Sequence, residues 1–205
     1  MAKRLPIVLY GATGYTGQLI AQELDKRSIA FAVSGRNRDK LEALSDSLYS
    51  KPEVIVADVS DGPSLQGMAA RGRVIITAAG PFRTLGPPVQ DACLKAKAHF
   101  LDITVETPYM LDTFSRNQSF KDAGVMVVNA AGFDVVPTDL AAWLAVNTME
   151  GAEQVDIGLC VENLAGSQGT LRSMIGMLSA EPVSYESGEW RPQPLGAFSR
   201  GFSFP

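Results

Sequence analysis

Three glycines near the start of the chain have the spacing of a phosphate-binding turn. Gly11, Gly14 and Gly17 follow an apolar stretch over 6–10, and an amphipathic segment over 15–27 follows them. In such a turn the first glycine allows a tight exit from a strand. The second lets the backbone approach a diphosphate, the third lets the helix pack close to the sheet, and the helix amides bind the anion. The predicted cofactor contacts of this loop are Gly11, Thr13, Gly14, Tyr15, Thr16 and Gly17.

Two arginines after the second predicted strand, 30–34, bear on which dinucleotide would bind. NAD-binding proteins place an acidic residue for the ribose 2′-hydroxyl here, whereas this chain has Ser34, Gly35 and Arg36. A guanidinium binds a 2′-phosphate through two hydrogen bonds, and a carboxylate would repel it. The sequence therefore predicts NADP(H) as the cofactor, held by these three residues. Arg38 could share the role, or both arginines could be solvated charges that open the next helix.

Two further loops follow the predicted strands 53–57 and 73–78. Asp58 comes after the first, where a carboxylate either accepts a hydrogen bond from the adenine amino group or caps a turn or helix. Both interpretations stay open on sequence alone. The second strand runs into small residues that would let a cofactor lie against bare backbone. The predicted contacts there are Ala79, Gly80, Pro81 and Phe82. The prolines at 87 and 88 then predict the start of a helix.

The loops after the fifth and sixth predicted strands, 99–103 and 125–129, carry the candidates for proton transfer. The stretch 129–139 is too apolar for an ordinary surface loop, so we expect it, with Phe133, to wall the nicotinamide pocket. No residue stands out as a certain acid or base. The candidate proton donors, chosen by position alone, are Asp134, Thr104 and Tyr109.

Other polar residues near these strands are interpreted as structural. Asp102 and Glu106 lie near the expected cleft, but carboxylates at helix starts are often capping groups. His99, the only histidine, opens a strand at the end away from the cleft, so we expect a structural role for it. Thr138 and Asp139 predict the cap of the helix that follows.

Composition excludes several classes of function. The chain has 205 residues, a net charge of −4 and 20% charged residues without a basic run, so no nucleic-acid surface is expected. Cys93 and Cys160 belong to no CxxC or Cys/His cluster, so we expect no metal site and no disulfide. Polar residues interrupt the longest apolar stretch, 125–146, which excludes a membrane span there. No signal peptide is recognisable before the first strand, which favours a cytoplasmic location.

Strand and helix signals alternate through residues 1–150, which predicts an α/β Rossmann-type, doubly wound parallel sheet. The expected strands are 6–10, 30–34, 53–57, 73–78, 99–103 and 125–129. The expected helices are 15–27, 38–49, 88–97, 108–123 and 138–148. From 151 the pattern changes, with a strand-like stretch over 154–162 and a helical one over 169–180. We interpret 151–205 as the start of a second α+β domain that the chain leaves incomplete.

Taken together, five segments resemble the saccharopine dehydrogenase-like oxidoreductases, and within them the branch of the bacterial trans-acting enoyl reductases. These segments are Gly-Ala-Thr-Gly-Tyr-Thr-Gly at 11–17, Ser-Gly-Arg at 34–36, Ala-Gly-Pro-Phe at 79–82, Asp-Ile-Thr at 102–104 and Gly-Phe-Asp-Val-Val-Pro-Thr-Asp-Leu at 132–140. Two departures stand out. Val105 replaces the glycine of a common Thr-Gly-Glu segment, and 131–136 lacks the Cys-Gly-x-Asp-Pro-Gly segment of true saccharopine reductases, which argues against saccharopine as substrate.

The resemblance implies an NADP-binding Rossmann domain with a second domain inserted before the chain returns to finish the first. It also implies a length of roughly twice this chain, and a homodimer through the second domain is expected. The implied function is a reductase that transfers hydride from NADPH to an activated C=C, C=N or C=O bond of an unidentified small molecule, with an apolar substrate as one option.

Two rival functions differ from this one. A short-chain dehydrogenase or sugar epimerase can share the glycine turn, but its catalytic Tyr-x-x-x-Lys pair is missing, because no lysine lies four residues after any tyrosine. A redox sensor that binds NADP(H) without turnover is the second rival. The absence of an evident acid or base favours it.

Overall fold

The computed structural model describes residues 4–151, 154–158, 160, 183–186, 188–193, 201 and 203. The strands are β1 (Leu5–Tyr10), β2 (Phe31–Gly35), β3 (Glu53–Val56), β4 (Gly72–Thr77), β5 (His99–Asp102), β6 (Val127–Val128), β7 (Val183–Glu186) and β8 (Glu189–Pro192). The helices are α1 (Tyr15–Lys26), α2 (Arg38–Ser47), α3 (Gly62–Arg71), α4 (Phe82–Ala96), α5 (Thr107–Ser115), α6 (Asn117–Asp122) and α7 (Val136–Thr148).

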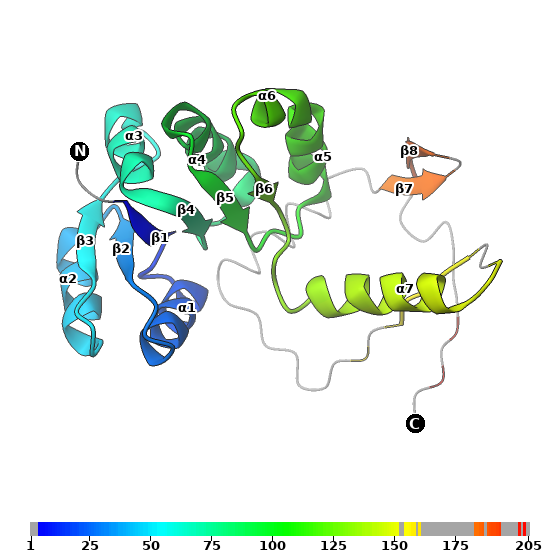
Figure 1. The fold of residues 1–205 in the computed structure, drawn as a ribbon, viewed down its shortest axis with the longest axis horizontal. Helices are drawn as coiled ribbons and strands as arrows, with labels where there is room; N and C mark the ends of the chain where they lie inside the picture. Colours follow the sequence, from blue (N-terminus) through cyan, green and yellow to red (C-terminus); the bar gives the residue numbers. More distant parts are fainter. Residues whose placement is uncertain are drawn as a thin grey trace.

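A six-stranded parallel sheet has the order β3-β2-β1-β4-β5-β6 (Figure 1). The order reverses direction between β1 and β4, which is the switch point of a doubly wound sheet, so the predicted fold class is confirmed. The other two strands, β7 and β8, form an antiparallel pair.

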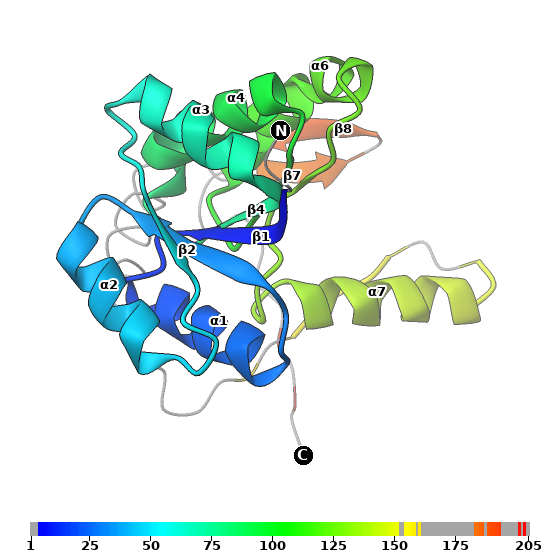
Figure 2. The same cartoon turned by 60° about the vertical axis from the view of Figure 1, so that its left-hand side comes forward.

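Helices cover the two faces of the sheet in separate groups (Figure 2). One face packs Leu9 and Val33 against α1 and α2 through buried residues such as Leu24 and Leu41. Val8, Ile75 and Phe100 point to the opposite face, where α3 and α4 contribute the buried residues Leu65, Met68, Val89 and Cys93. Successive side chains along each strand therefore lie in one or the other of two apolar layers, as a buried parallel sheet requires.

Several boundaries differ from those that the sequence predicts. The helix α3 was not expected; Asp61 caps it by accepting a hydrogen bond from the Ser64 amide at 3.3 Å, and a proline lies in its first turn. The predicted helix 108–123 is two helices that meet at Arg116. The strand β6 is shorter than predicted.

The largest boundary error concerns α4, which begins at Phe82 and not at the prolines. Pro87 and Pro88 lie inside this helix. A proline lacks the amide that would bond to the preceding turn, so the sequence alone argued for a start there. A carboxylate from another loop caps the true start, as described below.

Of residues 151–205, the structure describes only short stretches. Residues 154–158 and 160 lie in no strand, contrary to the strand-like pattern over 154–162. The helix predicted over 169–180 lies outside the described residues. Within the described part of the chain, no helix is long and apolar enough to cross a membrane.

Candidate cofactor site

The site lies at the edge of the sheet where the parallel strands end. The loops that leave β1, β2, β3 and β4 all emerge there, and β1 and β4 flank the switch point. Ligands of doubly wound sheets bind at this position. The loop residues can therefore be compared with the predicted contacts one by one.

The glycine loop is tied to two neighbouring strand ends. Gly11 has a φ of +78°, and its amide and that of Ala12 donate to the Ser34 carbonyl oxygen at 2.9 and 3.1 Å. A Cβ atom on Gly11 would lie 2.7 Å from the Ala79 backbone nitrogen. Both the positive φ and this close approach require glycine, so the tight exit predicted from the sequence is present.

The packing around the other two glycines, Gly14 and Gly17, differs in whether it leaves space for a side chain. A Cβ on Gly17 would lie 2.2 Å from the Gly11 carbonyl oxygen, so α1 can pack on the loop only without a side chain there. A Cβ on Gly14 would meet only that same oxygen at 3.4 Å, and Gly14 has an ordinary φ of −73°. Nothing in the packing requires glycine at 14. The backbone at Gly14 is exposed and can be approached by a ligand.

The start of α1 offers amides to such a ligand. The first intrahelical bond runs from the Gln18 amide to the Gly14 carbonyl oxygen at 2.9 Å, so the amides of residues 15–17 precede the helical ladder. Gly14, the residue at the N-cap, has no side chain to bond to them. Tyr15 is 71% exposed beside them. This helix start can hold the negative charge of a diphosphate.

The start of α4, by contrast, is already occupied by a carboxylate of the protein. Glu106, which is buried, accepts hydrogen bonds from the Phe82 amide at 2.9 Å and the Arg83 amide at 2.8 Å. Glu106 stands at the start of α5, as the sequence predicts, but its side chain caps α4, which begins 24 residues earlier. Between these two helix starts, only that of α1 is left for an anionic ligand.

The two arginines after β2 have different environments. Arg38 forms an ion pair with Glu42 at 3.4 Å, one turn along α2. Arg36 is exposed and forms no ion pair or hydrogen bond within the described residues. Its charge lies near Tyr10 and Asp58, since it lowers the pKa of each as a minor contribution. Arg36 is therefore the arginine that is available to a 2′-phosphate.

The other residues of this segment lie beneath the surface. Ser34 is fully buried, its carbonyl oxygen accepts the two loop amides, and its hydroxyl has no partner among the residues described. Gly35 is also buried. Asn37 caps α2 by accepting from the Lys40 amide at 2.9 Å. The predicted trio thus reaches the surface only at Arg36.

Asp58 has a turn role in the structure. Its Oδ1 atom accepts from the Ser60 amide at 2.9 Å and from the Ser60 hydroxyl at 2.7 Å, and these bonds lower the pKa of the carboxyl group. Asp58 is only partly buried beside Arg36, so a contact with adenine remains sterically open. Tyr10, which was not among the predicted contacts, is buried at the end of β1 within electrostatic range of both residues. Burial raises the pKa of its hydroxyl, and the nearby Asp58 charge adds to this effect.

The loop after β4 presents backbone, as predicted, but not its phenylalanine. Ala79, Gly80 and Pro81 are partly exposed. Phe82 is 7% exposed and stacks on Tyr109 with ring centroids 6.4 Å apart. Its ring packs on Tyr109, and its backbone amide is bonded to Glu106. The predicted contact at Phe82 therefore does not line the surface of the site.

Two of the three candidate proton donors are buried. Thr104 is fully buried, and its hydroxyl oxygen accepts from the Glu106 amide at 3.0 Å. Tyr109 is 1% exposed and donates its hydroxyl proton to Asp102 Oδ2 at 2.9 Å. Burial, together with the Asp102 charge, raises the pKa of Tyr109. Both hydroxyls are thus removed from the surface, whereas Asp134 is exposed, and Phe133 next to it is 86% exposed.

A buried polar network behind this edge was not recognised in the sequence as a unit. Asp102 is fully buried at the end of β5, and burial raises the pKa of its carboxyl group although four hydrogen bonds oppose the shift. Gln90 is 1% exposed on the core side of α4. A glutamine among Val89, Ala92 and Cys93 is the signal that could have revealed the network, because polar groups on an apolar helix face need partners.

The remaining singled-out residues have structural roles. His99 accepts a hydrogen bond from the Met126 amide at 3.0 Å, as expected for a histidine away from the cleft. Thr138 and Asp139 do not cap α7, because that helix begins at Val136 and Thr138 bonds to the Val135 carbonyl oxygen at 2.8 Å. Cys93 and Cys160 are both free thiols.

Comparison with known proteins agrees with this geometry. Residues 7–128 match the model of the saccharopine dehydrogenase NADP binding domain. A putative trans-acting enoyl reductase from Mycobacterium tuberculosis is 35% identical over 86% of this chain and 45% of its own length. The human saccharopine dehydrogenase-like oxidoreductase is 30% identical over 71% of this chain and 38% of its own length. The chain thus spans less than half the length of these relatives.

A solved structure shares the fold. Apo saccharopine dehydrogenase (L-Glu forming) from Saccharomyces cerevisiae superposes with a TM-score of 0.58 and 22% identity, covering 68% of this chain and 30% of that one. Three features fit an NADP(H) molecule: the start of α1, which no N-cap side chain bonds, the exposed backbone at Gly14, and Arg36, which forms no ion pair among the described residues. The chain belongs to the family of the saccharopine dehydrogenase NADP-binding domain, a family of oxidoreductases, and its cofactor is NADP(H).

Proposed function

We propose that this chain is the cofactor-binding part of a reductase that transfers hydride from NADPH to an activated C=C, C=N or C=O bond. The observation that carries the proposal is the combination of an exposed glycine turn at Gly14 with the Arg36 guanidinium, which forms no ion pair within the described part of the chain. When bound, NADPH supplies the hydride, and the protein supplies position and charge. A relative named as an enoyl reductase supports a C=C bond as the first bond type to test.

Each part of the edge has a distinct binding role in this proposal. The amides of residues 15–17 and the bare backbone at Gly14 would hold the diphosphate, with Thr13, Tyr15 and Thr16 beside it. Arg36 would bind the 2′-phosphate, and Asp58 would face the adenine. Ala79, Gly80 and Pro81 would present backbone to the cofactor, while Phe133 would cover the nicotinamide.

The chemistry beyond the cofactor rests on the exposed part of the 129–139 stretch. Asp134 is the one exposed candidate of the three proposed proton donors, so it is the residue that would deliver a proton. The exposed ring of Phe133 supports a substrate with apolar character. The division at residue 150, a homodimer through the second domain and a cytoplasmic location belong to the same proposal.

The test is a titration of wild type, Arg36→Ala and Arg38→Ala with NADPH and with NADH. Loss of a charge-assisted bond to the 2′-phosphate should weaken NADPH binding about tenfold or more in Arg36→Ala. NADH binding should change little, because it lacks that phosphate. Arg38→Ala is the matched control, since Arg38 is already paired with Glu42. Equal losses for NADPH and NADH in Arg36→Ala would refute the assignment.

A second candidate function is a sensor that binds NADP(H) without turnover. The burial of Thr104 and Tyr109 favours it, because these side chains are thereby removed from acid or base roles. Incubation of a longer chain that includes the second domain with NADPH and an enone, an imine or a ketone separates the two. Oxidation of NADPH by any of these supports the reductase, and binding without oxidation by all of them supports the sensor.

A further inference from the structure

The buried carboxylate of Asp102 is the common anchor of the loop that follows β6. Its Oδ2 atom accepts from the Asn129 side-chain amide at 2.7 Å, and its Oδ1 atom accepts from the Ala130 backbone amide at 3.1 Å. The Asp102 carbonyl oxygen accepts from the Ala131 amide at 2.8 Å. One residue thus holds three consecutive residues of the loop.

The conformation that these bonds hold is not one that the loop would adopt by itself. Ala130 has a φ of 59°, in the left-handed region that residues with a side chain rarely occupy. Such a conformation persists only where the surroundings enforce it, and it is frequent at functional sites. Here the enforcing bonds come from Asp102, and the loop leads directly to the exposed Phe133.

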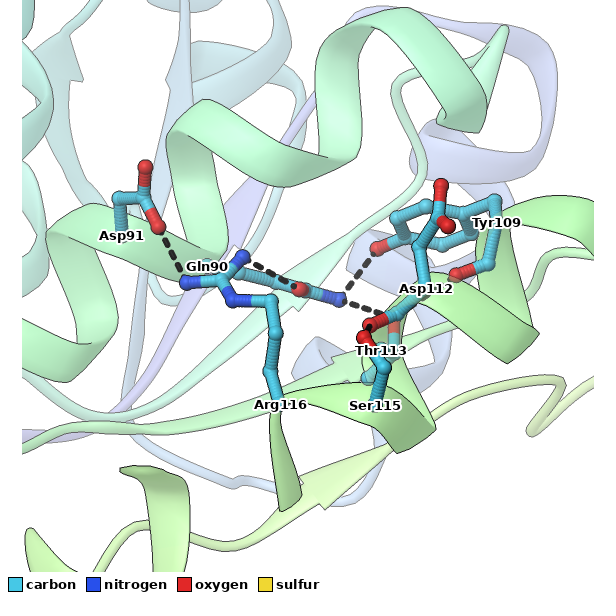
Figure 3. Close-up of polar contacts among 7 residues, drawn as sticks. All are labelled: Gln90, Asp91, Tyr109, Asp112, Thr113, Ser115 and Arg116. Carbon is cyan, nitrogen blue, oxygen red and sulfur yellow. Dashed lines mark hydrogen bonds and ion pairs between the residues drawn. The ribbon is translucent and has the colours of Figure 1, made fainter. Parts of the chain in front are cut away.

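Asp102 is in turn held from behind by the polar network. Tyr109 donates to Asp102 Oδ2 and accepts from the Gln90 side-chain amide at 2.7 Å. Figure 3 shows the Gln90 side chain of α4 directed toward both Tyr109 and Thr113 of α5, and its bond to Thr113 is 2.9 Å long. Arg116 forms an ion pair with Asp91 beside them. The carboxylate therefore has a fixed position between the sheet and two helices.

We infer that Asp102 is a positioning residue, which fixes the loop 129–133 in the geometry that receives the nicotinamide half of bound NADP(H). This inference rests on the proposed function. Binding of the adenosine half of the cofactor should not depend on Asp102, because in the proposed binding mode that half lies at the ends of β1, β2 and β3. Asp102 touches neither cofactor nor substrate and acts only through the loop.

Two probes separate the halves of the cofactor: NADPH, and 2′,5′-ADP, which lacks the nicotinamide. Asp102→Ala removes all the side-chain acceptors that hold the loop. If the fraction of molecules with the loop in place falls tenfold, the apparent Kd for NADPH rises about tenfold. The Kd for 2′,5′-ADP should stay within about twofold. Asp102→Asn keeps one oxygen for the Thr104 and Ala130 amides and should restore most NADPH affinity.

Tyr109→Phe is the matched control for stability. It removes a hydrogen bond to the same carboxylate but leaves the bonds to Asn129 and Ala130 intact. It should lower the midpoint of thermal unfolding while the ratio of the two Kd values stays at the wild-type value. If Asp102→Ala does not fold, Asn129→Ala takes its place, and a rise of about threefold in the NADPH Kd alone is then expected.

The outcomes separate this inference from the proposed function. Selective loss of NADPH affinity in Asp102→Ala, or in Asn129→Ala, with rescue in Asp102→Asn supports the positioning role. Parallel losses for NADPH and 2′,5′-ADP, or no loss for either, overturn the inference and leave the proposed function standing. Wild type that binds neither probe overturns both.

Discussion

A Cβ atom placed on Gly17 would lie 2.2 Å from the carbonyl oxygen of Gly11, so the first turn of α1 rests directly on the turn that ends β1. Gly14, between them, is not constrained in this way, since its Cβ would have space. The same motif therefore contains two glycines that the packing requires and one, Gly14, that the packing does not require. Single substitutions can separate these two cases.

Gly17→Ala should destabilise the protein by about 2 kcal/mol or more, because the methyl group would overlap the loop backbone. Gly14→Ala should change the free energy of unfolding by less than about 0.5 kcal/mol, since its φ suits alanine. It should nevertheless weaken NADPH binding about tenfold, because the methyl group fills the space that the diphosphate needs. Urea unfolding and NADPH titration of both variants check this. A Gly14→Ala variant with wild-type affinity would contradict the placement of the diphosphate.

The Glu106→Ala substitution tests how much the stability of α4 depends on a cap from another loop. Removal of the carboxylate leaves the Phe82 and Arg83 amides without their partner, which should lower the free energy of unfolding by about 2 kcal/mol. Asp61→Ala, the loss of an ordinary exposed cap on α3, is the control and should cost about 1 kcal/mol. Only Glu106→Ala should also weaken NADPH binding, because it frees the loop that ends at Pro81. Equal costs in urea unfolding would argue against a special role for Glu106.

Asp25 should make the stability depend on pH. Its carboxylate accepts from the Tyr49 and Ser50 amides, each at 2.8 Å, and hydrogen bonds from the Ser50 hydroxyl and these amides lower its pKa. The stabilising contribution is therefore present above the unfolded-state pKa of about 3.9 and is lost as the pH falls through the lower folded-state value. At neutral pH wild type should have a higher thermal midpoint than Asp25→Asn. This difference should shrink at about pH 3, and a constant difference would contradict the assignment.

The two cysteines should react with thiol reagents at very different rates. Burial raises the pKa of the Cys93 thiol to about 12, whereas Cys160 is exposed. Because the thiolate is the reactive form, Cys160 should react first in native protein, and Cys93 should react only when the protein unfolds. Titration with a chromogenic disulfide, before and after addition of denaturant, measures this. In Cys160→Ser the fast phase should disappear, and its persistence would show that Cys93 is accessible.

The amino-acid sequence was sufficient to predict the six parallel strands, most of the helices between them and the tight glycine turn after β1. This was possible because these features depend on local patterns: apolar strands, helical periodicity and the spacing of Gly11, Gly14 and Gly17. Arg36 could be chosen by the same reasoning, since it follows directly on a strand end. The choice between Arg36 and Arg38 rests on the ion pair of Arg38 with Glu42, one turn along the same helix, a local spacing that the sequence interpretation did not use.

Which carboxylates and hydroxyls are buried and bonded, and which are exposed, depends on contacts between loops that are distant in the sequence. Glu106 caps α4, and Asp102 holds the loop after β6, through contacts with residues more than 20 positions away in the sequence. Thr104 and Tyr109 were predicted near the cleft by their distance from a strand end, but burial and hydrogen bonding withdraw them from it. A sequence pattern reports what a residue could donate or accept. Which partner it meets depends on how the sheet and its helices bring separate loops together.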